Sequence, residues 1–112
     1  AALPTTPVPK ATGAQARTVA EVTQGRAALK DKVVVIRARV VKVNNGIMGK
    51  NWLHVQDGSG QAQDGSNDLL VTSAETAAAG DVVTLRGTVR TDVSLGAGYH
   101  YEVMVEGASL KK

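Results

Sequence analysis

A long run of β-branched residues limits the folds open to this chain more than any other feature. The run KVVVIRARVVKV occupies residues 32–43. β-branched side chains favour extended backbone, and side chains in a strand point alternately to its two faces. Arg37 and Arg39 therefore share one face. We expect a strand that is too long to stay flat and that bends to serve two parts of a small barrel.

Four more segments have the composition of strands, and turn-forming residues lie at their ends. The hairpin signal Asn44-Asn45-Gly46 follows the first strand, and a Gly-rich polar loop, residues 57–68, follows the second. The expected later strands are residues 51–56, 68–72, 82–91 and 99–110. Five strands with a long, bent first one fit a closed or nearly closed barrel, because closure removes sheet edges. The sequence predicts an all-β fold.

The N-terminal segment differs in composition from the rest of the chain. Residues 1–17 hold all three prolines and show no apolar periodicity, so we expect an extended Pro-containing arm, followed by one domain over residues 18–112. Thr18 and Glu21 have the spacing of a capping box. A short N-terminal helix is therefore predicted over residues 19–29, although Gly25 lies inside it.

Four strings, taken in order, carry a family resemblance: GIMGKNWLHVQDGSG, NDLLVT, GDVVTLRGTV and GAGYHYEVMVE. Together they resemble a family of small exported bacterial OB-fold proteins, some of them associated with c-type cytochrome systems. The likeness covers residues 18–110. Ala38 stands where the family often has a glycine, and Leu95 where it has an aromatic residue. The resemblance implies a five-stranded OB-fold barrel, suggests an oligonucleotide-binding module and hints at a cytochrome partner.

Charge is distributed unevenly along the chain. The formal net charge is only +3, but no acidic residue lies between Asp31 and Asp57. OB domains bind single strands on the face of the second and third strands, using cations and aromatic stacking. Single-stranded nucleic acid is therefore the leading ligand. The candidate contacts are Arg37, Arg39, Lys42, Lys50, Asn51, Trp52, His54, Arg86, Arg90 and Tyr99.

These candidate contacts have structural alternatives. The basic interval is equally compatible with a solvated strand face. Trp52 is a stacking platform in one interpretation and covers the end of the barrel, with Met48 beside it, in the other. Tyr99 and Tyr101 alternate onto the face of the last strand that we expect to face the core.

No cofactor, metal or catalytic site is expected. Cysteine is absent, no nucleophile is placed with His54, and no phosphate-binding loop motif occurs. Copper has soft or borderline ligands to choose from in His54, His100, Met48 and Met104, but the histidines lie far apart in sequence. The loop 57–68 has the length of a calcium loop, yet Ala62 stands where such a loop requires glycine.

An alternative function rests on the arm. Residues 1–17, with Leu3 and Val8, can add to the exposed barrel edge of a neighbouring copy and build a homo-oligomer or filament, or bind another protein; a disordered tether is the simpler possibility. The Ala1-Ala2 start is compatible with signal-peptide cleavage, so we expect a periplasmic or extracellular location. No apolar stretch approaches the length of about 20 residues that spans a membrane.

Overall fold

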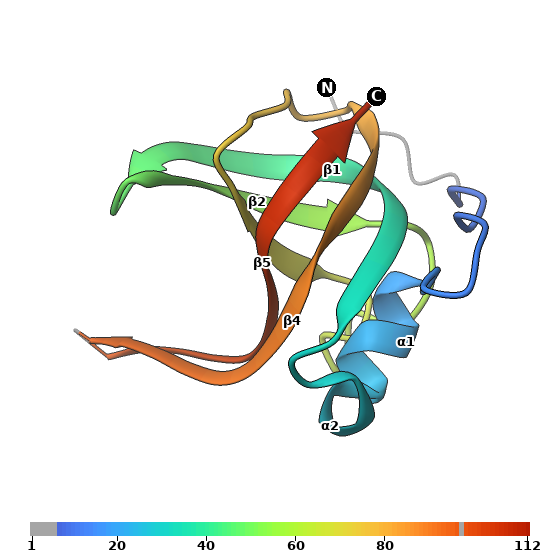
Figure 1. Ribbon diagram of the computed structural model, residues 1–112, viewed down its shortest axis with the longest axis horizontal. Helices are drawn as coiled ribbons and strands as arrows, with labels where there is room; N and C mark the ends of the chain where they lie inside the picture. Colours follow the sequence, from blue (N-terminus) through green and yellow to red (C-terminus); the bar gives the residue numbers. More distant parts are fainter. Residues whose placement is uncertain (1–6, 97) are drawn as a thin grey trace.

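Five strands form one sheet that closes in a ring in the computed structural model, which describes residues 7–96 and 98–112 (Figure 1). The strands are β1 (Val33–Ile47), β2 (Lys50–Gln56), β3 (Leu69–Ser73), β4 (Val82–Gly96) and β5 (Tyr99–Lys111). Their order around the ring is β1-β2-β3-β5-β4. All neighbours are antiparallel except β3 and β5, which pair in parallel. The prediction of an all-β chain is confirmed.

The interior of the ring is filled by aliphatic side chains. Along β1 the residues alternate between buried and half-buried from Val33 to Val40, and Ile36 and Ala38 have no exposed surface. The same β1 pairs with β4 through its first half and with β2 through its second half, and Arg39 pairs with both. The long first strand therefore bends between two neighbours, as its length predicted, although Ala38 replaces the glycine expected at the bend.

Two short helices cover one end of the ring: α1 (Val19–Gln24) and α2 (Arg26–Leu29). Val19 and Val22 are fully buried in the core. The predicted capping box is present, since the Thr18 hydroxyl accepts from the Glu21 amide at 3.0 Å and the Glu21 carboxylate accepts from the Thr18 amide at 2.8 Å.

The prediction of a single helix over residues 19–29 was wrong at its middle. Gly25 has φ −98° and ψ 21°, which are not helical values, and it separates α1 from α2. A Cβ at this position would lie 2.7 Å from the Glu21 carbonyl oxygen. The chain can therefore turn this tightly only because residue 25 has no side chain.

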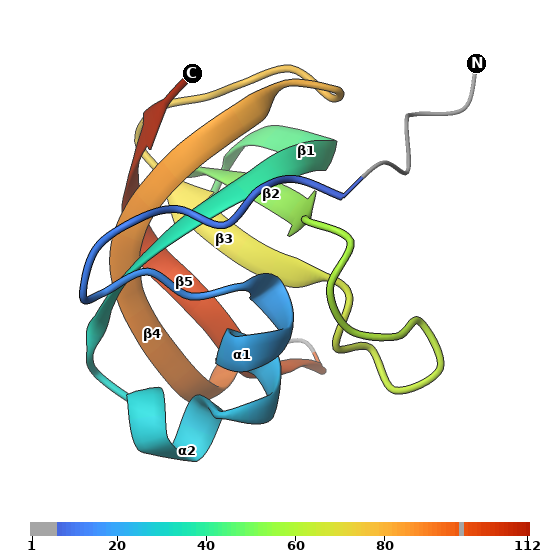
Figure 2. The same ribbon diagram turned by 90° about the vertical axis from the view of Figure 1, so that its right-hand side faces the viewer.

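The described part of the arm, residues 7–17, lies against its own chain (Figure 2). The Val35 amide donates to the Gln15 carbonyl and the Arg17 amide donates to the Val35 carbonyl, both at 2.9 Å. Further along, the Val8 amide donates to the Asp57 carbonyl at 3.0 Å, and the Val8 side chain is buried. The arm thus occupies the edge of β1 that β2 leaves unpaired.

Two long hairpins, β1–β2 and β4–β5, extend from the ring toward the same side of the molecule (Figure 1). Each is a continuation of antiparallel pairs beyond the ring, with register shifts near its end. Within the described residues, no helix has the length and apolarity that crossing a membrane requires.

Candidate ligand-binding groove

A groove of about 380 Å³ lies where the β1–β2 hairpin, the outer face of β2 and β3, and β5 come together. Its lining residues are Lys42, Asn44, Ile47, Met48, Trp52, His54, Leu70 and Tyr101. Three of the ten predicted contacts, Lys42, Trp52 and His54, are among them. None of these described lining residues is acidic.

The register of the sheet orders these side chains into rows. Lys42 is opposite His54, and His54 is opposite Leu70, so the three cross β1, β2 and β3 in one row. Trp52 is opposite Asn44 in the neighbouring row. Opposite residues of an antiparallel pair share one face, so the first row has its polar end at Lys42 on β1 and its apolar end at Leu70 on β3, while the second row continues to Thr72.

The floor of the groove is a second apolar cluster, separate from the core inside the ring. Trp52, Leu70 and Met104 form it, with exposed fractions of 6%, 6% and 2%. Tyr101 packs against this cluster, and its ring centre lies 6.4 Å from that of Trp52, with the planes tilted by 36°. Trp52 is therefore neither an open stacking platform nor a plug inside the ring: it is the floor of the groove.

The expected face of Tyr101 needs correction. Tyr101 was predicted on the core face but packs on the outer cluster, because this part of the β4–β5 hairpin extends beyond the ring and its inner face meets the groove. Met48 lies at the hairpin tip with its side chain 61% exposed, and it lines the same groove as Trp52.

Asn51 and Trp52 hold the tip of the β1–β2 hairpin in place. The Trp52 indole Nε1 donates to the Ile47 carbonyl at 2.8 Å, and the Asn51 side-chain oxygen accepts from the Gly46 amide at 3.1 Å. The Asn51 side-chain nitrogen donates to the Glu75 carbonyl at 3.1 Å. Asn51, predicted as a ligand contact, thus already bonds the protein with its amide group.

The glycines of the tip serve a backbone requirement. Gly46 and Gly49 have φ of 73° and 76°, and Met48 between them has φ 53°, all in the left-handed region. This turn leaves Ile47 and Met48 as large apolar side chains that are 46% and 61% exposed. They form the open wall of the groove.

His54 is oriented by the residue that precedes β3. Its Nδ1 lies 3.1 Å from the Asp68 carboxylate, which also accepts from the Gln56 side chain at 3.2 Å. Burial raises the pKa of Asp68, but the hydrogen bonds from His54 and Gln56 outweigh burial and bring that pKa below its ordinary value. The imidazole is therefore fixed at the polar side of the groove by an ionised partner.

The remaining predicted contacts are not gathered in the groove. Arg37 and Arg39 lie on the stretch of β1 that pairs with β4, where Arg86 also lies. Lys50 is exposed at the start of β2, beside the hairpin tip. Arg39 has interactions of its own within the chain. The sequence periodicity predicted which strand face these cations share, but it could not show which region of the outer surface of the closed sheet each cation belongs to.

The last two predicted contacts are Arg90 and Tyr99. Arg90 pairs with the Asp31 carboxylate at 2.7 Å and lies 3.9 Å from the Glu106 carboxylate, so acidic neighbours offset its charge. The backbone of Tyr99 begins β5, but its side chain lies outside the described part of the molecule, as does that of Leu95.

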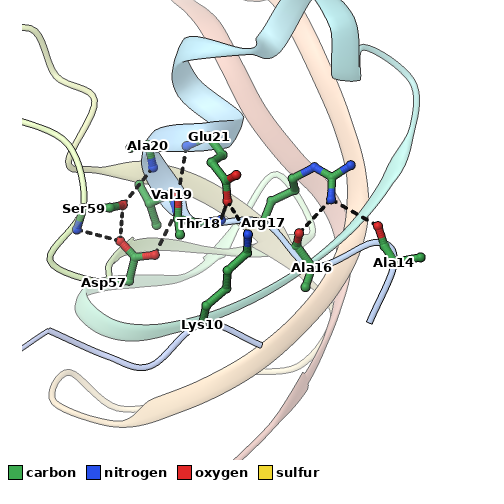
Figure 3. A network of polar contacts seen from close by, with 10 residues as sticks. All are labelled: Lys10, Ala14, Ala16, Arg17, Thr18, Val19, Ala20, Glu21, Asp57 and Ser59. Carbon is green, nitrogen blue, oxygen red and sulfur yellow. Dashed lines mark hydrogen bonds and ion pairs between the residues drawn. The ribbon is translucent and has the colours of Figure 1, made fainter. Parts of the chain in front are cut away.

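The loop after β2 serves the fold of α1 (Figure 3). One Asp57 carboxylate oxygen accepts from the Val19 amide at 3.0 Å, and the other accepts from the Ser59 amide and hydroxyl. The Ser59 hydroxyl in turn accepts from the Ala20 amide at 2.9 Å. Among the described residues, no three His, Cys, Asp or Glu side chains come together in a way that could hold a metal ion.

Sequence reasoning missed Leu70 and assigned Tyr101 to the core. The signal for Leu70 was present in the alternation of β3, because Leu69 and Val71 face the core and the residue between them must face outward. For Tyr101 the sequence held no such signal, since its surroundings depend on how far the hairpin extends past the ring.

Comparison of the chain with protein-family models, with curated proteins and with solved structures found no match in any of the three. The resemblance to exported OB-fold proteins, and the export and cytochrome association that it suggests, therefore stay predictions.

Proposed function

We propose that the chain is a non-enzymatic OB-fold module that binds single-stranded nucleic acid in the groove. The strand order supports the OB-fold assignment, because a five-stranded Greek-key barrel whose second and third strands present the binding face defines that fold. The groove lies over this face and beside the hairpin that follows the first strand.

One observation carries the proposal: the groove joins an aromatic floor to a cationic edge. Tyr101 supplies open aromatic surface over the floor that Trp52 forms, Lys42 supplies a positive charge, and none of the described lining residues carries a carboxylate that would repel phosphate. The rows of the sheet orient the ligand. Phosphate groups lie toward Lys42 on β1, and bases lie toward Leu70 and Tyr101.

The binding is weak and sensitive to salt. Each base stacked on an aromatic side chain contributes about 1–3 kcal/mol. The half-buried Tyr101 ring is the open aromatic surface, since Trp52 is 94% covered by the protein. With one stacked base and one or two cations, the groove holds a short segment of strand.

The test is a titration of a fluorescent oligothymidylate of about four nucleotides, the smallest site size typical of an OB fold. Anisotropy is measured at low and moderate salt. We expect saturable binding that Tyr101→Ala weakens about tenfold, the equivalent of about 1.4 kcal/mol. Lys42→Gln reduces the steepness of the salt dependence by about 0.7 on a double-logarithmic plot.

Lys30→Gln is the matched control. Lys30 is exposed at the end of α2, does not line the groove, and carries the same charge. We expect this variant to bind like the wild type. Absence of saturable binding at low salt, or equal losses in Lys30→Gln and Lys42→Gln, overturns the proposal.

The assembly alternative stays a prediction. It needs the arm to contact a neighbouring copy, whereas residues 7–17 contact their own β1 and the loop after β2. Nothing in the described residues favours an exchange of these contacts between copies.

A further inference from the structure

A basic face lies on the outer side of the sheet where β4 runs between β1 and β5. We define it by Arg37, Arg86 and Lys111 with the two small residues between them, Thr84 and Ser109. Arg37 is opposite Thr84, and Thr84 is opposite Lys111, so these three cross the sheet in one row. Arg86 and Ser109 are opposite each other in the next row. Arg86, Ser109 and Lys111 are exposed and Arg37 is half-buried.

Among the described residues, the cations of this face have no carboxylate partner, whereas several other cations of the molecule do. Arg90 on the same strand pairs with Asp31, Arg26 pairs with Glu102, and Lys112 pairs with Asp81. Within the described residues, Arg37 and Lys111 form no ion pair. Arg86 bonds only a neutral group, the Gln15 side-chain oxygen, at 3.1 Å. The positive charge of the face is therefore available to an anion from outside.

The spacing of the face suits a chain of phosphates. Adjacent strands lie about 4.8 Å apart, so Arg37 and Lys111 are about 10 Å apart across β4. Thr84 and Ser109 are small hydroxyl residues that leave the surface between the cations open and offer hydrogen-bond donors. None of these five residues is aromatic or apolar, and the described residue opposite Arg86 on β1, Val35, is a half-buried aliphatic residue. The face can neutralise a backbone but has no surface for stacking bases.

Strand β1 connects this face to the groove. Lys42 lies at the polar edge of the groove, and Arg37 lies five positions earlier on the same strand, about 16 Å away at the rise of an extended chain. Arg39 lies between them. We propose that a bound single strand leaves the groove past Lys42, follows β1 and places its sugar–phosphate backbone on the basic face.

This inference rests on the proposed function of the groove, and it adds a second contact region for the same ligand. The groove supplies base contacts to a short segment, and the basic face supplies phosphate contacts that only a longer strand reaches. The affinity therefore depends on strand length. The added affinity is electrostatic, so it carries most of the salt dependence.

The experiment compares oligothymidylates of about 4 and about 16 nucleotides, the two ends of the usual range of OB-fold site sizes. Each is titrated into the wild type and into a variant with Arg37→Gln, Arg86→Gln and Lys111→Gln, with thermal unfolding as a check on folding. The expected result is that the variant binds the short strand like the wild type. Its slope of log affinity against log salt for the long strand is smaller by about 2, because each contact to a single strand contributes about 0.7.

In affinity terms, between about 50 mM and about 200 mM salt the wild type loses about 20-fold more affinity for the long strand than the variant does. Arg90→Gln is the matched control, since it removes an equal charge from the same strand where Asp31 already neutralises it. We expect it to leave the slope unchanged.

The outcomes separate the two proposals. If the short strand binds but the long strand is no tighter, or if the triple variant and Arg90→Gln lower the slope equally, the basic face is not a contact and only this inference is overturned. If neither strand binds, or if only the long strand binds and Tyr101→Ala leaves that binding unchanged, the groove proposal is overturned and this inference with it.

Discussion

The indole nitrogen of Trp52 donates a hydrogen bond to the backbone carbonyl of Ile47 at 2.8 Å. The residue that floors the groove therefore also fixes the hairpin that forms its wall. This explains why a chain with one tryptophan places it just after the turn GIMG. The ring needs the turn as a partner for its polar nitrogen, and the turn needs the ring to hold its left-handed backbone in one place.

Trp52→Phe is expected to loosen the hairpin while retaining most of the apolar floor. The substitution removes the donor to Ile47, and a hydrogen bond of this kind contributes about 0.5–1.5 kcal/mol. Hydrogen exchange at the amides of residues 46–50 should become faster, with little change in the core of β1. Trp52→Ala, which also removes the ring, should cost about 3–5 kcal/mol in unfolding free energy. Unchanged exchange in Trp52→Phe would contradict this role.

Gly58→Ala is expected to detach the arm. A Cβ at Gly58 would lie 2.8 Å from the Pro7 Cα, and Gly58 has φ 87°, where an alanine is strained. Trypsin should then cleave after Lys10 faster than in the wild type, because the Val8 contact to Asp57 is lost.

Gly65→Ala is the control for Gly58→Ala, because it introduces backbone strain in the same loop without a steric contact to the arm. Gly65 has φ 76°, but open space surrounds its Cβ position. It should therefore lower stability through strain without changing the rate of cleavage after Lys10. Equal cleavage in the two glycine variants would show that the arm does not depend on the Gly58 contact.

Much of the fold could be predicted because its signals are local. The alternation in β1 and the capping spacing of Thr18 and Glu21 depend on neighbours within a few residues. The prediction of one continuous helix failed at Gly25, because the low helix propensity of this one residue interrupts the pattern. The docking of the arm on Val35 could not be predicted, because it depends on an edge that exists only after β1 bends.

The candidate site was harder to predict than the fold. Lys42, Trp52 and His54 were found because the period of two places alternate residues of β1 and β2 on one face. Arg37 and Arg86 were predicted as part of the same site. Periodicity shows that a residue faces outward, but it does not show on which region of the outer surface of a closed sheet the residue lies. That distinction requires the strand order.

Asp57→Ala is expected to destabilise the protein through α1, although the two lie far apart in sequence. The buried Asp57 carboxylate accepts the Val19 amide, and a hydrogen bond to a charged group contributes about 1.5–3 kcal/mol. Urea unfolding should show a loss of about this size. Ser59→Ala, which removes the hydroxyl that accepts from Ala20, should cost less, because a bond to a neutral group contributes about 1 kcal/mol. If Asp57→Ala unfolds like the wild type, the loop does not cap the helix.

Acid should destabilise the protein through Asp68. The folded-state pKa of Asp68 lies below its ordinary value of 3.8, because the hydrogen bonds from His54 and Gln56 outweigh the effect of burial. A lowered carboxyl pKa stabilises the folded state above the unfolded-state value, and this stability is lost as the pH falls through the folded-state pKa. The free energy of unfolding should therefore decrease with falling pH below about 3.8, and less steeply in Asp68→Asn, which should be the less stable protein at neutral pH.

Asp92→Asn is the control for this pH dependence. Asp92 lies 3.9 Å from the other histidine, His100, but its side chain is 80% exposed. Asp92→Asn should leave the wild-type decrease of unfolding free energy with falling pH unchanged. His54→Gln, which removes the main partner of Asp68, should make that decrease, the acid slope, smaller. Urea unfolding between about pH 2.5 and about pH 7 measures all four proteins. If Asp68→Asn and Asp92→Asn change the acid slope equally, the pair of His54 and Asp68 does not hold the groove together.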